Sequence, residues 1–221
     1  MVLTKHDSQR GRTSPHLTIV VKKLPLAVLL LLIFLALGNA TGLTTSAGRI
    51  ADRLAGKLAL YVRVAQLYTR EPDQQIAMPV DDVSKSHVTN TWQAPRGNDR
   101  LHQGQDIFAP RGTPVRSATE GYVTKIGENS LGGQTISVVG AGGRFYYYAH
   151  LDSYAPGITE GDWVTPQTVL GFVGTTGNAA GTPPHLHFGV YSTGGALNPL
   201  PLLTDRPKEN KPKAETKPVR R

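Results

Sequence analysis

The sequence predicts an all-β domain, an antiparallel β-sandwich, preceded by an N-terminal membrane or signal helix and by one amphipathic helix. Three observations lead to this fold class. Residues 24–37 form an uninterrupted apolar run, residues 50–68 repeat apolar side chains at helical spacing, and residues 80–203 consist of short β-rich runs separated by glycine. At 221 residues the chain has room for one well-buried domain with flanking segments.

The N-terminal segments are typical of an export signal. Residues 1–23 hold five Lys or Arg against one Asp, as in a basic cytoplasmic n-region, and residues 24–40 are a signal peptide or a retained signal-anchor. The apolar run would span about 21 Å as a helix, less than the ~30 Å hydrocarbon core, and "GNA" before Thr41 resembles a cleavage site. Both alternatives place the chain after Asn39 across the membrane. We therefore expect an exported, periplasmic or extracytoplasmic protein, anchored to the inner membrane if the helix is retained.

Residues 41–79 predict one amphipathic helix followed by a linker. Apolar side chains recur at steps of three and four beside a basic stripe of Arg49, Arg53 and Lys57. The pattern ends before Pro72, because proline stops helices. We expect this helix to dock on the domain; pairing with a partner helix or lying on anionic lipid are the alternatives. The apolar positions are Ile50, Leu54, Leu58, Tyr61, Val64 and Tyr68.

The predicted domain, residues 80–203, contains a hairpin and a weak internal repeat. The run "VVGAGGRFYYYAH" predicts two antiparallel strands with a turn at or near residues 141–143. Residues 111–123 are echoed by residues 160–173, which predicts duplicated β-units stacked in the sandwich. The matching pairs are Gly112 with Gly161, Val115 with Val164, Gly121 with Gly171, and Val123 with Val173.

The net positive charge lies at the two ends of the chain. Residues 204–221 have no apolar periodicity and predict a disordered basic tail, with seven Lys or Arg against three acids from Asp205 onward. Together with the n-region this tail accounts for the whole net charge of +8, so the segment between them is neutral. A nucleic-acid partner is not expected, since such a protein would carry its basic residues on the folded domain. The chain has no cysteine, which excludes disulfides and thiolate metal sites.

Four of the seven histidines fall in three short motifs of the predicted domain. In "LHQGQD", His102, Gly104 and Asp106 would face one side of an extended segment, and the glycine would leave room for an ion. In "FYYYAHLD", His150 is expected on the same strand face as Tyr146 and Tyr148.

The third motif, "HLHF", is the strongest of the three. On a strand, His185 and His187 emerge on one face while Leu186 and Phe188 pack on the other. Zinc suits the combined set of four histidines and one aspartate, because it binds imidazole nitrogen and carboxylate oxygen. A catalytic zinc site uses three protein ligands, so two of the five residues would remain for the reaction.

These motifs carry a resemblance to a known family. "HQGQD", "YAHL" and "HLHF", with "APRGTPVRSATEGYV" and "GDWVTPQTVLGFVGTTGNAAGTPPHLHFGVY" around them, resemble the lysostaphin/LytM family of zinc metallopeptidases, peptidase family M23, over roughly residues 91–203. Members of that family cut peptide cross-bridges of bacterial cell walls, so the resemblance implies a zinc-dependent endopeptidase whose substrate is peptidoglycan peptide. It also implies one Zn²⁺ per chain, held by His102, Asp106 and His187, with His150 and His185 serving the reaction.

The resemblance implies a mechanism and shows one departure. Zinc would activate a water molecule and polarise the scissile carbonyl. His185 would accept the water proton and His150 would hydrogen-bond the oxyanion or the leaving amine, or the two roles are exchanged. The family's F-G-x-R sequence before the first ligand is here "TWQAPRG", so we expect a different substrate groove near Trp92.

Three other functions are alternatives to the endopeptidase. A non-catalytic LytM-like activator of a cell-wall amidase would need a cell-wall hydrolase partner but no metal ligands, whereas this chain keeps all five residues. Zinc D,D-carboxypeptidases typically have a Glu before the last histidine, where this chain has Pro184. The glycine and valine echo also resembles lipoyl- and biotinyl-type β-units, so the duplicated units are expected to be hybrids of that type. A function as a lipoyl or biotinyl carrier is not expected, because a carrier domain would need a lysine at the hairpin turn and neither repeat has one.

Overall fold

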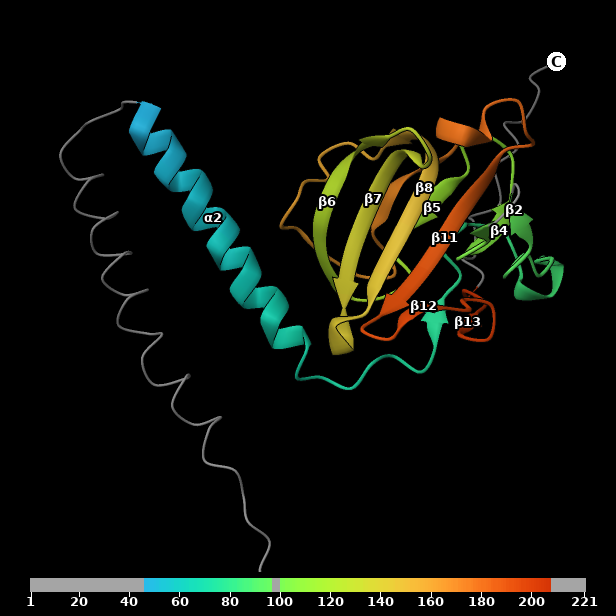
Figure 1. Ribbon diagram of the computed structural model, residues 1–221, viewed down its shortest axis with the longest axis horizontal. Helices are drawn as coiled ribbons and strands as arrows, with labels where there is room; N and C mark the ends of the chain where they lie inside the picture. Colours follow the sequence, from blue (N-terminus) through green and yellow to red (C-terminus); the bar gives the residue numbers. More distant parts are fainter. Residues whose placement is uncertain (1–45, 97–99, 208–221) are drawn as a thin grey trace, which may run out of the picture. The chain divides into compact units, whose positions relative to one another are not determined.

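The computed structural model describes residues 46–96 and 100–207 (Figure 1). The predicted n-region, the signal or anchor segment at residues 24–40 and the tail from residue 208 lie outside the described residues. The chain divides into two compact units, residues 1–56 and 57–221, and only the beginning of a helix is described in the first unit. Within the described ranges, no helix has both the length and the apolar character needed to cross a membrane.

The predicted amphipathic helix is confirmed as α2 (Ser46–Leu67). It is rich in alanine and leucine and free of proline, as a stable helix requires. Its buried side chain is Leu67, which is 2% exposed and lies outside the predicted apolar stripe. Much of that stripe is exposed in the structure: Ile50, Leu54, Tyr61 and Tyr68 are between 56% and 72% accessible.

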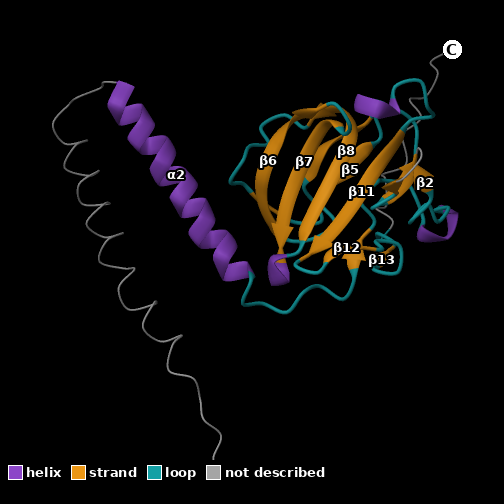
Figure 2. Ribbon diagram, viewed as in Figure 1, coloured by secondary structure: helices purple, strands orange, loops and turns teal. Residues whose placement is uncertain are grey.

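Most of the remaining structure is antiparallel β-sheet, as predicted (Figure 2). Nine strands form one sheet, and two further pairs form two-stranded sheets, of which β1 with β13 is parallel. The strands are β1 (Ile76–Ala77), β2 (Pro95–Arg96), β3 (Arg100–Leu101), β4 (Gln105–Phe108), β5 (Pro114–Arg116), β6 (Gly121–Asn129), β7 (Gly133–Gly140), β8 (Phe145–Tyr154), β9 (Trp163–Val164), β10 (Val169–Val173), β11 (His185–Ser192), β12 (Gly195–Leu197) and β13 (Leu203–Thr204). Three short 3₁₀ helices interrupt them: η1 (Lys85–His87), η2 (Ala141–Gly143) and η3 (Gly177–Ala179).

The predicted hairpin is confirmed between β7 and β8. Its turn is η2, where Gly142 and Gly143 have φ of 67° and 66°. This left-handed backbone conformation favours glycine, because a Cβ would crowd the neighbouring carbonyl. Strands β6, β7, β8 and β11 lie side by side in this order and form the broad layer seen in Figure 1.

The two echoed segments pair with each other in the sheet. Strand β5 of the first segment is antiparallel to β10 of the second, and β6 is antiparallel to β9. Val115 lies opposite Gly171, and Gly121 lies opposite Val164. In both pairs a valine of one segment is therefore the cross-strand partner of a glycine of the other segment. The duplication itself stays a prediction.

A single apolar core supports the strand that carries two of the histidines. The core cluster contains Val115 of β5 and Leu170 of β10 together with residues of β6, β7, β8 and β11, as two packed layers require. In β11, Leu186 and Phe188 are fully buried in this core. Because side chains alternate along a strand, the neighbouring His185 and His187 emerge on the opposite face.

Candidate metal centre

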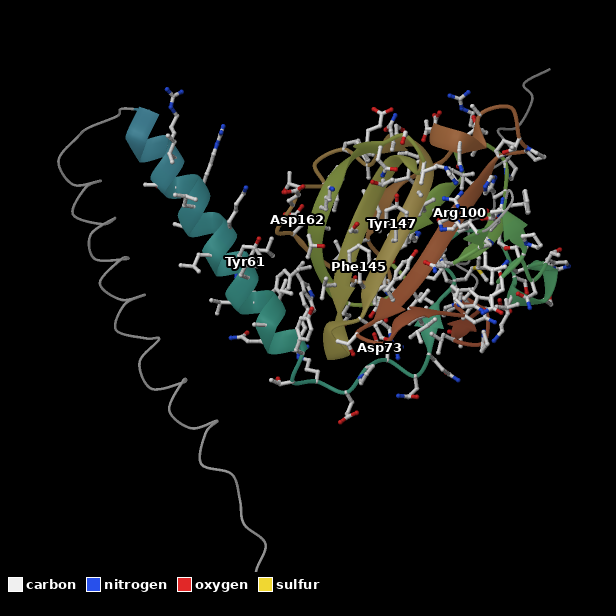
Figure 3. All side chains as sticks on the ribbon, in the orientation of Figure 1. Tyr61, Asp73, Arg100, Phe145, Tyr147 and Asp162 are labelled. Atoms are coloured by element: carbon white, nitrogen blue, oxygen red, sulfur yellow. The ribbon has the colours of Figure 1, made fainter. Side chains whose placement is uncertain are left out.

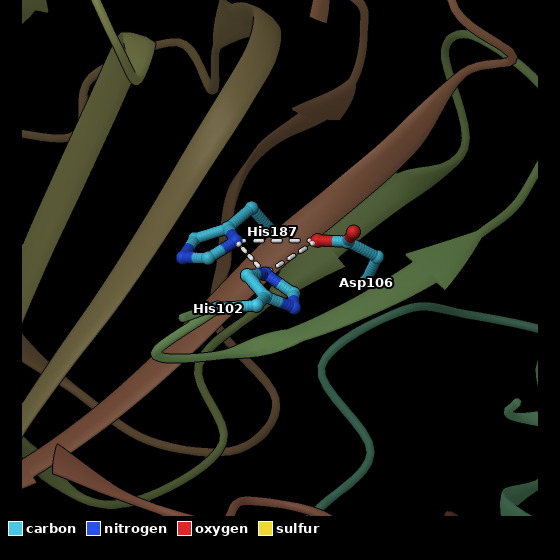
Figure 4. Close-up of side chains that lie close together, drawn as sticks. All are labelled: His102, Asp106 and His187. Carbon is cyan, nitrogen blue, oxygen red and sulfur yellow. Dashed lines mark hydrogen bonds and ion pairs between the residues drawn. The ribbon is translucent and has the colours of Figure 1, made fainter. Parts of the chain in front are cut away.

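Three of the predicted site residues converge on one point (Figure 4). His102 Nε2 lies 2.8 Å from His187 Nδ1 and 3.1 Å from Asp106 Oδ1, and His187 Nδ1 lies 3.2 Å from the same carboxylate oxygen. All three side chains are largely buried. The structure thus brings together His102, Asp106 and His187, which the sequence separates by up to 85 residues.

The sheet register explains the meeting of Asp106 and His187. Strand β4 pairs with β11 so that Asp106 and His187 are direct cross-strand partners. Such partners have Cβ atoms about 4.5–5.5 Å apart on one face of the sheet. His102 joins them from the segment before β4, four residues upstream of Asp106.

Backbone carbonyls set the orientation of three imidazoles. His102 Nδ1 lies 2.7 Å from the Thr91 carbonyl, His150 Nδ1 lies 2.9 Å from that of Thr176, and His185 Nδ1 lies 2.8 Å from that of Pro183. A carbonyl oxygen only accepts, so each Nδ1 carries the proton and donates it. In the neutral ring the other nitrogen, Nε2, is then unprotonated and its lone pair is available to bind a metal ion or accept a proton.

The converging atoms fit a zinc ion. Bonds of about 2.0–2.2 Å in tetrahedral geometry place ligand atoms roughly 3.3–3.6 Å apart. The observed separations of 2.8–3.2 Å are a few tenths of an ångström shorter. The lone pair of His102 Nε2 and the carboxylate of Asp106 face each other at 3.1 Å, and a cation between two such donors turns their repulsion into attraction.

The electrostatics of the centre favour an ionised Asp106 and a neutral His187. Burial by itself raises the pKa of the Asp106 carboxyl, but when the His102 and His187 rings are protonated their hydrogen bonds and positive charge outweigh burial and hold that pKa well below its ordinary value. Burial lowers the pKa of His187. The second carboxylate oxygen, Asp106 Oδ2, accepts a hydrogen bond from the Arg96 guanidinium.

His150 occupies a bulge in β8. The register between β7 and β8 shifts between the pairs Gln134 with Leu151 and Ile136 with Tyr148, and His150 has φ of 63°. A bulge with a left-handed residue turns a side chain to the other face of the strand. The prediction that His150 shares the face of Tyr146 and Tyr148 is therefore wrong, because both tyrosines are fully buried in the core while His150 lines the cleft.

The four imidazoles surround one cleft. The His150 ring centroid lies 5.1 Å from that of His185 and 5.8 Å from that of His187. His185 Nε2 lies 4.0 Å from Asp106 Oδ1, outside the triangle of closest atoms. Burial lowers the pKa of His150 to about 4, so this imidazole is neutral near pH 7. All five predicted residues line the same cavity, of about 360 Å³.

Some supporting residues were not identified from the sequence. Gln105 is fully buried, and its amide donates to the carbonyl of Thr89 at 2.5 Å and to Thr91 Oγ1 at 3.1 Å. The Asp106 backbone N–H donates to the same Thr91 hydroxyl at 2.9 Å. Thr91 therefore connects β4 to the carbonyl that orients His102. One sign of these supports is present in the sequence, because Gln105 directly precedes the predicted ligand Asp106. Nothing in the sequence indicates that Arg96 contacts Asp106.

Comparisons with known proteins show similarity to peptidases. A family model described as Peptidase family M23 matches residues 100–199. The L-Ala--D-Glu endopeptidase of Bacillus subtilis (strain 168) is 33% identical over 163 residues, 69% of this chain and 50% of that protein. The DD-carboxypeptidase/endopeptidase Mpg of Neisseria meningitidis serogroup B is 36% identical over 121 residues, 55% of this chain and 25% of that protein.

Solved structures are also similar to part of this chain. The catalytic domain of the antimicrobial peptidase lysostaphin from Staphylococcus simulans has 30% identity and a TM-score of 0.47, covering 53% of this chain and 92% of that chain. The present chain spans about half the length of the Bacillus relative and a quarter of the Neisseria relative.

Proposed function

Residues 100–199 form a domain of peptidase family M23, and on this premise we propose that the protein is a zinc-dependent endopeptidase that hydrolyses peptide cross-links of peptidoglycan. The observation that carries the proposal is the triangle of His102 Nε2, Asp106 Oδ1 and His187 Nδ1, with His150 and His185 in the same cleft. The Bacillus relative, named as an endopeptidase, supports the reaction class.

Three residues would hold one zinc ion. His102 and His187 supply nitrogen lone pairs and Asp106 supplies a negative oxygen, which is the donor set that zinc prefers. When bound, zinc supplies a Lewis acid that makes water nucleophilic near neutral pH. The hydrogen bond from His102 to Thr91 and the contact of Arg96 with Asp106 keep two of the ligands in place.

His150 and His185 would move the protons. Each has its Nδ1 fixed to a backbone carbonyl, so each neutral ring has its lone pair on Nε2. Either ring can accept the proton of the attacking water and then, as an imidazolium, donate it to the leaving amine as the amide C–N bond breaks. This step gives a carboxylic acid and an amine, which together carry both protons of the water. Transfer of the acid proton to the amine then gives a carboxylate and an ammonium group near neutral pH.

A peptidoglycan substrate would place the domain outside the cytoplasmic membrane. We assign residues 80–203 to the exported peptidase domain and residues 24–40 to its signal or anchor. Peptidoglycan peptide is the proposed partner, and an amidase-type cell-wall hydrolase is the partner under the activator alternative.

Digestion of purified sacculi by the zinc-loaded full chain tests this proposal, with bound zinc measured in parallel. We expect solubilised fragments with new amine ends, whose masses identify the cleaved bond. His187→Ala should lose both zinc and activity, whereas His87→Ala, an exposed histidine outside the cleft, should lose neither. Unchanged sacculi from a zinc-loaded protein would reject hydrolysis and favour the activator.

A further inference from the structure

Two arginines face each other at the rim of the cleft. In the ribbon formed by β2 and β3, Arg96 and Arg100 are direct cross-strand partners, so their side chains leave the same face. Both line the cleft, and Figure 3 labels Arg100 together with Tyr147 of the cleft. Like charges placed directly opposite each other destabilise a strand pair. This arrangement therefore costs stability unless an anion lies between or beside the two guanidinium groups.

The described cleft has too little negative charge for both arginines. Its acidic side chain is Asp106, which already contacts Arg96 and the two imidazoles. Arg100 is exposed, and no ion pair joins it to any of the described residues. The cleft lining also includes the uncharged polar side chains of Asn129, Tyr147, Asn178, Thr182 and Tyr191. A divalent cation on Asp106 would leave this rim still more positive.

We propose that Arg100, beside Arg96, binds a free carboxylate of the substrate, so that the peptide cleaved is an acidic one. The guanidinium fork matches a carboxylate with two parallel hydrogen bonds, which an uncharged amide does not provide. Stem peptides of peptidoglycan carry free carboxyl groups near their cross-links, whereas a polyglycine bridge has none along its length. The inference rests on the proposed function for the identity of the peptide, and it selects stem peptides over glycine bridges.

Equilibrium binding separates this inference from catalysis. Two labelled peptides of identical sequence are compared by fluorescence anisotropy with the full chain, one with free carboxyl groups and one with every carboxyl group converted to an amide. We expect the acidic peptide to bind about tenfold more tightly than the amidated one, which is the contribution of about one charge-assisted hydrogen bond. This ratio of the two Kd values should fall as added salt screens the charges. Arg100→Gln should reduce the ratio to about one.

Lys125→Gln is the matched control, because it removes one exposed positive charge from β6, outside the cleft. The control should keep the tenfold ratio. Equal binding of both peptides by the unmodified chain, or an unchanged ratio in Arg100→Gln, overturns the inference. Tighter binding of the acidic peptide without any cleavage upholds the carboxylate site and instead rejects the proposed hydrolysis.

Discussion

Gly104 separates the first two predicted ligands and packs against the third. A Cβ at this position would lie 2.5 Å from Cε1 and 2.7 Å from Nε2 of the His187 ring. It would also meet the carbonyl of Phe188 at 3.0 Å. The sequence predicted that this glycine leaves room for an ion. In the structure the room is taken by the imidazole ring of His187.

Gly104→Ala is therefore expected to displace His187. We expect zinc affinity to fall about 10–100-fold and the free energy of unfolding to fall by about 1–3 kcal/mol. Competition with a chromogenic chelator measures the affinity, and urea unfolding measures the stability. Gly127→Ala is the control, because a Cβ there meets nothing within 4 Å. Unaltered zinc affinity in Gly104→Ala would contradict the packing described.

At the residue scale, five candidate residues were accessible from the sequence because the chemistry of zinc limits the residue types, and the resemblance to family M23 selected three of them as ligands. His102, Asp106 and His187 lie in compact motifs, and the structure places their donor atoms together. The residues that orient these ligands by hydrogen bonds were harder to identify from the sequence. Thr91 orients His102 through its backbone carbonyl, which every residue has, so this contact depends on the position of Thr91 and not on its residue type.

At the element scale, a pair of glycines holds the loop that orients His150. Gly133 and Gly177 both have positive φ, and a Cβ on either would strike the backbone of the other. Thr176, whose carbonyl accepts the hydrogen bond from His150 Nδ1, directly precedes Gly177. This close contact joins the start of β7 to η3 and fixes the position of that carbonyl.

Gly177→Ala is expected to move the Thr176 carbonyl and release His150. Because His150 is not among the three converging ligands, kcat should fall about 100-fold while zinc content stays unchanged. Sacculus digestion and metal analysis of the same sample give the two values. Gly181→Ala also places alanine at a positive φ, of 80°, but meets nothing within 4 Å, so it controls for backbone strain alone. Zinc loss in Gly177→Ala would show that the loop supports the ligands instead.

The bulge at His150 shows where strand periodicity fails. Regular alternation would bury this histidine beside Tyr148, but one left-handed residue turns it into the cleft. The alternation of His185 and His187 holds because β11 continues its regular pairing with β4 there. A bulge depends on the register of the neighbouring strands, which the local sequence does not display.

At the scale of the whole molecule, a metal would join distant parts of the chain. His102 lies just before β4 and Asp106 lies within it, whereas His187 lies in β11, more than 80 residues later. An ion that binds only the folded arrangement stabilises it in proportion to the logarithm of its concentration. The centre is thus expected to contribute to stability as well as to chemistry.

Removal of zinc should lower the melting temperature. At a free zinc concentration of about 100 times Kd, the linkage amounts to about 2.7 kcal/mol, or roughly 5–10 °C for a chain of this size. Differential scanning calorimetry with and without a chelator measures the shift, and added zinc should restore it. Asp106→Asn should melt at the same temperature in both conditions. A zinc-independent melting temperature of the unmodified chain would argue against the proposed centre.

The sequence alone determined the β-rich domain, the hairpin at residues 141–143, the amphipathic helix and the five residues of the candidate site. These follow from local chemistry, because side-chain period, turn glycines and metal-ligand types can all be read along a short segment. Tertiary structure alone decided that Asp106 faces His187, that the bulge turns His150 into the cleft, and that Arg96 and Arg100 crowd one rim. Each of these depends on which strands pair and in what register, and that is set by packing across the whole core.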